Sequence, residues 1–222
     1  MNRIARSAAS ALALITIAAT AFLPAGAAAG SGPAANGAAL LRKMAQVNPH
    51  LKSYTASIHA DVTLHAFVSL SPTLDGTYYH KEPGKDKLVF TSGVPSIAKQ
   101  FSKIYPHIDS PSSWNSVYVV STGPDDGTYT AFKLVPRRNG RVDHIDVKVD
   151  DKLATISEMR WTYNDGGYAL LDQTYKQIDG NYLVTHQTGH VDTPHYSADL
   201  VSTFSNFKVN VPISDAVFKA ES

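Results

Sequence analysis

The longest regular pattern of apolar and polar positions runs from residue 54 to residue 68. Apolar side chains alternate there with mostly polar ones, which is the two-residue period of a half-buried β-strand. At about 3.3 Å per residue, a straight strand of this length would span roughly 50 Å. Because a compact domain of this size is narrower, the pattern predicts a strongly curved strand, as in a barrel or half-barrel.

Shorter patterns of the same kind predict that most of the remaining chain is also β-structure. A hairpin is expected around Pro83-Gly84, and from Trp114 onward the turns carry Asp-Gly or Asn-Gly signals. The expected strands are 76–81, 85–90, 115–121, 128–136, 141–149, 153–163, 168–177, 181–190 and 197–211. Their regular spacing and short turns favour one continuous antiparallel sheet.

Two short segments have the periodicity of amphipathic helices. Residues 37–48 follow Asn36, the expected N-cap, and residues 95–105 begin with a proline. Such short helices must dock on an apolar surface, so we expect them to cover the sheet as a lid. The lid residues are expected to be Leu40, Leu41, Met44, Ile97 and Phe101.

These elements predict a mainly β (α+β) fold: a single curved antiparallel sheet forming an incomplete barrel with a lid of short α-helices. Two arrangements remain open, a closed barrel filled by side chains and an open barrel with a ligand cavity under the lid. In the open arrangement Trp161 is expected to face the cavity, whereas Trp114 is expected at a loop edge. The candidate lining residues are Ile58, Val62, Leu64, Leu88, Phe90, Ile145, Val147, Met159, Trp161 and Tyr163.

The beginning of the chain has the pattern of an export signal rather than of a folded domain. Two arginines precede an apolar run that ends near Leu23, and small residues follow Pro24. A membrane anchor is the alternative, although the run is shorter than the roughly 20 apolar residues that a span needs. The expected organisation is a secretory signal peptide over 1–29, a flexible leader over 30–36 and one domain over 37–222, located in the periplasm or outside the cell.

The composition of the chain excludes several kinds of site and partner. The sequence contains no cysteine, which excludes disulfides, a lipid-modified cysteine and cysteine-ligated metal. Lys and Arg number 20 against 19 Asp and Glu, so the basic excess of a nucleic-acid-binding protein is missing. We therefore expect a protein without nucleic-acid partners whose stability comes from its apolar core.

Candidate sites for catalysis or metal binding are weak. The motifs of nucleophilic catalysis and phosphate binding are missing, and the paired carboxylates at 125–126 and 150–151 fall in expected turns. In one histidine-rich tract, two histidines on the same face of a strand would lie roughly 13 Å apart. The tract contains His186, His190, Asp192 and His195. We predict no catalytic residue, no metal and no cofactor.

The segment PRRNGR (136–141) places three arginines at the tip of an expected hairpin. A solvated turn is one interpretation. Contact with anionic lipid headgroups or an acidic partner is the other, and each charge near a membrane contributes about 1 kcal/mol.

Five tracts follow the export signal and the Leu40-Leu41 helix in a definite order. They are LKSYTASIHADVTL (51–64), GTYYHKEPGKDKLVF (76–90), GTYTAFKLVPRR (127–138), VDHIDVKVD with LATISEMRWTYNDGG (142–167) and FSNFKVNVPISDAVFKA (204–220). In their order and spacing they resemble the LolA/LolB-like superfamily of periplasmic lipoprotein carriers and related lipid-binding proteins. The resemblance covers nearly all of the mature chain.

The resemblance implies an incomplete antiparallel barrel whose apolar inner surface shelters acyl chains. The expected function is that of a soluble exported carrier of a lipid or lipoprotein, with a membrane donor complex and an acceptor protein as further partners. We expect the carrier to act as a monomer. One position departs from the family, because Glu82 stands where its hairpin often carries an arginine that helps hold the lid closed.

Two other functions remain open. The first is a regulatory or sensor module of the same fold that binds a lipidated ligand or a protein partner. The second is an interaction domain whose core is filled.

Overall fold

A computed structural model describes residues 33–65, 69–91, 108–194 and 196–219, with side chains from Asn36 onward. All of these residues belong to one compact unit of the chain, Ser31–Ser222. The predicted signal peptide and the predicted helix over 95–105 lie outside the described residues. Within them, no helix is long and apolar enough to cross a membrane.

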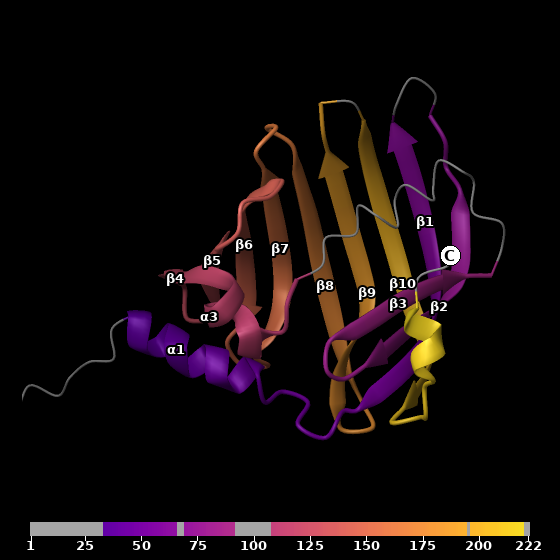
Figure 1. Cartoon of the computed structure of the whole chain (residues 1–222), viewed down its shortest axis with the longest axis horizontal. Coiled ribbons are helices and arrows are strands. Elements are labelled where there is room, and N and C mark those ends of the chain that lie inside the picture. The colour runs from indigo at the N-terminus through magenta and orange to yellow at the C-terminus, as the bar shows by residue number, and fades with distance from the viewer. Residues whose placement is uncertain (1–32, 66–68, 92–107, 195, 220–222) are drawn as a thin grey trace, which may run out of the picture. The chain divides into compact units, whose positions relative to one another are not determined.

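Ten antiparallel strands form a single sheet in the order β3-β2-β1-β10-β9-β8-β7-β6-β5-β4 (Figure 1). Neighbours in the sheet are neighbours in the chain except where β1 pairs with β10. The strands are β1 Ser53–His65, β2 Thr73–Lys81, β3 Lys85–Phe90, β4 Tyr118–Asp125, β5 Tyr129–Pro136, β6 Val142–Asp150, β7 Thr155–Tyr163, β8 Tyr168–Ile178, β9 Asn181–Asp192 and β10 Ser197–Val209. The edges β3 and β4 do not pair, so the predicted incomplete barrel is confirmed.

The period-two pattern of β1 is the one that the sequence predicted. Ala56, Ile58, Ala60, Val62 and Leu64 are buried, and the side chains between them are more exposed. We call the sheet face that carries these five residues the inner face, and the opposite one the outer face. Burial of alternate residues on one side fixes the register of the strand, because a slip by one residue would expose the whole apolar set.

Asp-Gly turns connect the strands where the sequence predicted them. Gly127 and Gly180 have positive φ angles of 82° and 79°, which glycine adopts without the steric cost of a side chain. The Asp126 carboxylate accepts hydrogen bonds from the backbone N–H groups of Thr128 and Tyr129 at 2.9 and 2.7 Å. These bonds lower the pKa of Asp126 and close the turn between β4 and β5.

The first helix, α1 Pro33–Met44, begins and ends four residues earlier than predicted. Proline suits the first turn of a helix because its missing N–H would have no partner there, so Asn36 lies inside the helix and does not cap it. Asn48 was predicted to belong to the helix. Its side chain instead donates to the carbonyl of Tyr182 and accepts from the N–H of Tyr182, which ties the chain to β9.

A short helix, α3 Trp114–Val117, replaces the first residues of a predicted strand. It follows the 3-10 turn η1 Pro111–Ser113, and the chain ends in a second one, η2 Asp215–Phe218. Trp114 was predicted at a loop edge, and this prediction is wrong because its side chain is completely buried. The indole N–H donates to the carbonyl of Asp109 at 2.7 Å, which satisfies its one polar atom inside the core.

Two separate groups of apolar side chains are buried. The first cluster extends from β4 to β8 and includes α1 and α3 residues. Its buried members are Leu40, Met44, Trp114, Tyr118, Phe132, Leu134, Ile145, Val147, Val149, Ala154, Ile156, Met159, Trp161, Tyr163, Ala169 and Leu171. The second cluster joins buried Ile58, Ala60, Val62 and Leu74 to the partly buried Leu88, Phe90, Leu200 and Phe204, on β1, β2, β3 and β10.

Candidate ligand-binding face

The inner face divides the ten predicted lining residues between the two clusters. Those of β6 and β7 lie in the first cluster: Ile145, Val147, Met159, Trp161 and Tyr163. Those of β1 and β3 lie in the second, Ile58, Val62, Leu88 and Phe90, while Leu64 is buried on the same face of β1. The structure therefore brings them together as two patches of one face, and not as one lining.

Helix α1 closes the first cluster. Leu40 and Met44 are buried in it and Leu41 packs against it, while the Trp114 ring meets Phe132 edge-on with their centroids 6.1 Å apart. The other predicted lid residues, Ile97 and Phe101, lie outside the described residues. At this end of the sheet the described side chains build the filled core that the sequence left open as one alternative.

The described helices do not build the second cluster. The main contacts of α1 and α3 are with β4 and η1, and those of η2 are with β3. The η2 contact involves Asp215, which binds the ammonium groups of Lys81 and Lys85 at 3.0 Å each. Strand alternation places these lysines on the outer face, opposite Leu88. The second cluster is thus formed by strands alone among the described elements.

A row of polar side chains crosses the inner face beside the second cluster. The strand register pairs Ser202 of β10 with Gln187 of β9, and Gln187 with Gln173 of β8. Ser202 and Gln187 are buried, and Gln173 accepts a hydrogen bond from the Tyr175 hydroxyl at 2.9 Å. Sequence analysis missed this row, although its signal is visible: Ser202 stands at an inward position between Leu200 and Phe204.

Two buried polar atoms lack a hydrogen-bond partner among the described side chains, Trp161 Nε1 and Ser202 Oγ. Buried polar groups are normally paired, because an unpaired one costs roughly 1–3 kcal/mol. Trp161 belongs to the filled first cluster. Ser202 adjoins the second cluster, so its hydroxyl is the one that a ligand on that surface could meet.

A group of aromatic and ionisable side chains occupies the inner face at the β2–β3 hairpin. The Tyr78 hydroxyl donates to Asp86, and His80 contacts Asp86 at 2.7 Å and Glu82 at 3.3 Å. Burial lowers the pKa of His80, but the two carboxylates together raise this pKa by more than burial lowers it, so the net shift is upward. Tyr54 lies over this group with its ring 5.1 Å from the His80 ring, and burial raises the pKa of its hydroxyl. Glu82 thus pairs with His80, and this position offers no positive charge to a lid.

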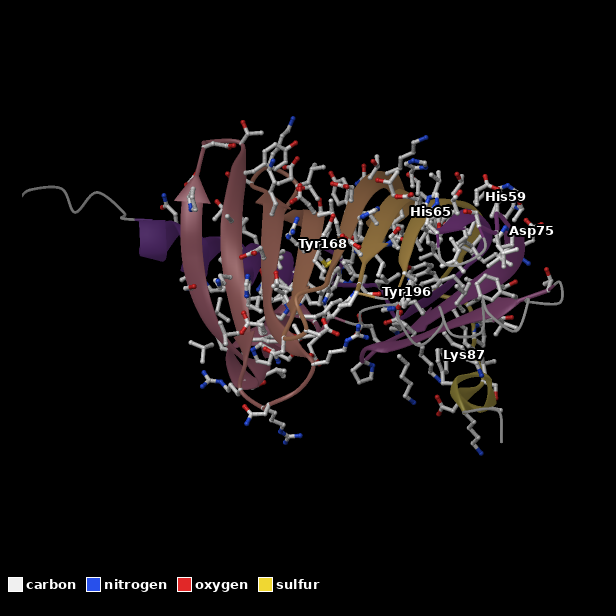
Figure 2. The ribbon with its side chains drawn as sticks, turned by 90° about the horizontal axis from the view of Figure 1, so that it is seen from above. His59, His65, Asp75, Lys87, Tyr168 and Tyr196 are labelled. Carbon is white, nitrogen blue, oxygen red and sulfur yellow. The ribbon has the colours of Figure 1, made fainter. Side chains whose placement is uncertain are left out.

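The outer face carries histidine–carboxylate pairs. His59 contacts Asp75 at 2.8 Å, and Figure 2 shows the two side chains together. Asp199 of β10 lies between His190 at 2.7 Å and His65 at 3.4 Å. The pair between His59 and Asp75 raises the pKa of the imidazole. These exposed pairs contribute little to stability because water screens them.

The predicted histidine-rich tract does not form a metal site among the described residues. His190 is paired with Asp199, and the register places His186 opposite Thr203. His195 lies outside the described residues. No group of three histidine or carboxylate side chains with the geometry for a metal ion occurs in the described part of the chain.

The remaining candidate charges serve the turns. Arg137 donates to the carbonyl of Asn115, and Arg141 contacts Asp165 at 3.3 Å and lies over the Tyr163 ring. Asp150 accepts from the N–H groups that follow it, as expected of a turn residue. Two of the three arginines at the hairpin tip are therefore engaged within the fold.

Comparison with solved structures decides the fold. An outer membrane lipoprotein-sorting protein domain from Vibrio parahaemolyticus has a TM-score of 0.58 at 10% identity, covering 81% of this chain and 94% of that one. The chain has a LolA-like fold. A DUF1329 family protein from Desulfovibrio piger gives 0.54 at 14% identity, covering 84% and 97%.

The LolA-like fold confirms the structural part of the resemblance that the sequence indicated. A LolA superfamily protein from Nitrosomonas europaea has a TM-score of 0.49 at 10% identity, over 82% of this chain and 97% of that one. No family model and no curated protein matches the sequence. The two matches with TM-scores above 0.5 establish the LolA-like fold alone at these identities, so the function must be argued from the inner face.

Proposed function

We propose that this protein is an exported, non-catalytic carrier that holds the acyl chains of a lipid or lipoprotein against the inner face of its sheet. The second cluster is the proposed surface for the chains. The segment before residue 30 is proposed to direct the protein to the periplasm or the cell exterior. A membrane donor and an acceptor protein complete the proposal, and the protein acts as a monomer.

The location of the described helices carries this proposal. They fill the first cluster and leave the second to be formed by strands alone among the described elements. An apolar row links the two, because the register aligns Val62, Leu200, Gly189 and Leu171 across β1, β10, β9 and β8. With neighbouring strands about 4.8 Å apart, the row extends over roughly 14 Å. An extended acyl chain matches a surface of this length and chemistry.

The energetics suit a reversible carrier. Each buried methylene contributes about 0.8 kcal/mol, so about 15 methylenes contribute roughly 12 kcal/mol. Association costs at least about 4 kcal/mol, so at most about 8 kcal/mol remains, which corresponds to a micromolar dissociation constant at the tightest. Binding of this kind depends on chain length and is insensitive to salt, because the driving force is apolar.

The chemistry of the described polar groups supports a non-catalytic role. Of the carboxylates that the sequence singled out, Asp125, Asp126 and Asp150 accept hydrogen bonds from backbone N–H groups within their turns. Asp151 accepts a hydrogen bond from the Thr130 hydroxyl of β5. The ionisable group around His80 is paired internally with Asp86 and Glu82.

A fluorescent acyl probe tests the proposal. Leu200 lies in the second cluster, whereas its neighbour Val201 is 45% exposed on the outer face. We expect the wild-type protein to bind the probe, Leu200→Gln to weaken binding about tenfold or more, and Val201→Gln to leave it unchanged. Affinity should rise with chain length. A wild-type protein that binds no acyl probe would overturn the proposal.

A further inference from the structure

The hydroxyl of Ser202 is an unusual group for its position. Its side chain is completely buried on the inner face, and Oγ has no hydrogen-bond partner among the described residues. Leu200 and Phe204, the inward residues on either side of it, belong to the second cluster. An alanine would fill this position without burying an unpaired donor, so packing alone gives no reason for a serine.

The side chains beside Ser202 on the inner face are small or uncharged. Its register partner on β1 is Ala60, a small side chain, and its partner on β9 is the buried Gln187. Gln173 continues the row on β8 and is oriented by the Tyr175 hydroxyl. Hydroxyl and amide groups therefore lie at the border of an apolar surface, and none of the side chains in this row carries a charge.

We propose that this row, centred on Ser202, binds the acyl carbonyl of the ligand. This inference rests on the proposed function and identifies the part of the ligand that the site recognises. The Ser202 hydroxyl donates a hydrogen bond to the carbonyl oxygen, while the hydrocarbon chain lies along the second cluster. An ester carbonyl of a lipid and an amide carbonyl of an acylated protein have this chemistry in common.

The absence of charge in the row determines the ligand class. An ionised headgroup would lose its hydration at a buried surface without gaining an opposite charge, which is costly. A carbonyl oxygen needs only one or two donors, which a serine hydroxyl and a glutamine amide supply. The row therefore selects neutral acyl linkages over free carboxylates.

Two ligands that differ only in the carbonyl test the inference. Methyl palmitate carries the ester carbonyl, and hexadecyl methyl ether has the same heavy-atom chain without it. Displacement of a fluorescent acyl probe from the purified protein gives both affinities. We expect the wild type to bind the ester roughly five- to tenfold more tightly than the ether, as one hydrogen bond provides. N-methylpalmitamide, run in parallel, shows whether the amide is recognised as well as the ester.

The variant Ser202→Ala should bind ester and ether equally, through loss of affinity for the ester alone. Its melting temperature should not fall, because the hydroxyl has no partner in the described part of the fold. Ser205→Ala removes the same group from an exposed position on the same strand and should behave as the wild type.

Each result decides between the two proposals. A wild type that binds neither ligand would overturn the proposed function, and this inference with it. A wild type that binds both without preference, or a Ser202→Ala variant that keeps the preference, would overturn the inference alone. A lower melting temperature for Ser202→Ala would reveal an internal partner for the hydroxyl and would also overturn it.

Discussion

Val62 is an inward position on β1 where a charged side chain should strongly reduce the stability of the fold. Its side chain is 7% exposed and belongs to the second cluster, whereas Val119 on the edge strand β4 is 52% exposed. Val62→Asp buries a carboxylate without a partner, and we expect it to lower the free energy of unfolding by several kcal/mol. Val119→Asp is the matched control and should change it by about 0.5 kcal/mol. Urea unfolding of both variants measures the difference, and equal losses would mean that the inner face is assigned incorrectly.

His80 links stability to pH at the β2–β3 hairpin. Its pKa lies above the ordinary value of 6.5, so the folded state favours the protonated imidazole. The stabilisation is fully present below pH 6.5 and is lost as pH rises through the raised pKa of His80. We therefore expect the free energy of unfolding to decline above pH 6.5, and His80→Gln to flatten this decline.

The control for His80 is His59, whose pKa is also raised but whose pair with Asp75 is solvent-exposed. His59→Gln should alter the pH profile less, because water screens an exposed pair. Urea unfolding between pH 5.5 and pH 8 gives the comparison. If the free energy of unfolding of His80→Gln declines with pH as steeply as that of the wild type, His80 is not the group whose proton stabilises the fold.

At the scale of elements, the contact of α1 with the sheet depends on Gly37. A Cβ at this position would overlap Thr122 Oγ1 of β4 and lie 2.8 Å from Cγ2. Helix propensity alone predicts that Gly37→Ala stabilises the helix by about 1 kcal/mol. We expect the opposite, a loss of about 1–3 kcal/mol, because the added methyl group forces α1 away from β4.

Thr122→Ala provides the test of this explanation. It removes both atoms that come closest to the new Cβ, so the cost of Gly37→Ala should be smaller in the Thr122→Ala background. Thermal unfolding of the two single variants and the double variant yields the coupling energy. If the two substitutions change the stability additively, the strain of Gly37→Ala does not come from Thr122.

Element boundaries were predictable where the signal is local. The alternation of β1 and the Asp-Gly turn at 126–127 depend on residues that are neighbours in the chain, and both were confirmed. Helix α1 starts earlier than predicted because Pro33 begins it, whereas its end and its packing on the sheet involve partners distant in sequence. Asn48 contacts Tyr182 and Gly37 contacts Thr122, and neither contact leaves a trace in the local pattern.

At the scale of the whole molecule, the export signal remains a prediction. We expect the exported protein to begin just after Ala27 or Ala29, because the small residues there suit a signal peptidase. N-terminal sequencing of the protein recovered from the cell envelope or medium measures this start. A full-length chain recovered in the membrane fraction would favour the membrane anchor instead.

By itself, the sequence determined the class of fold and the inward residues of β1, β3, β6 and β7. Period-two alternation and turn residues act over a few positions, so they specify a meander of strands without any knowledge of distant contacts. The same reasoning identified Val62, Leu88 and Met159 as inward residues, and all three lie in the two buried clusters.

Only the tertiary structure decided what covers each part of the inner face. The pairing of β1 with β10 joins segments more than 130 residues apart, and it places Ser202 beside Ala60. The position of α1 separates a filled cluster from the second cluster, and the burial of Trp114 follows from the packing around Phe132. A periodic pattern states which side of a strand is buried, whereas the partner that buries it is set by long-range packing. For this reason Ser202, the residue on which the further inference depends, was identified from the structure, although Leu200 and Phe204 mark its place in the sequence.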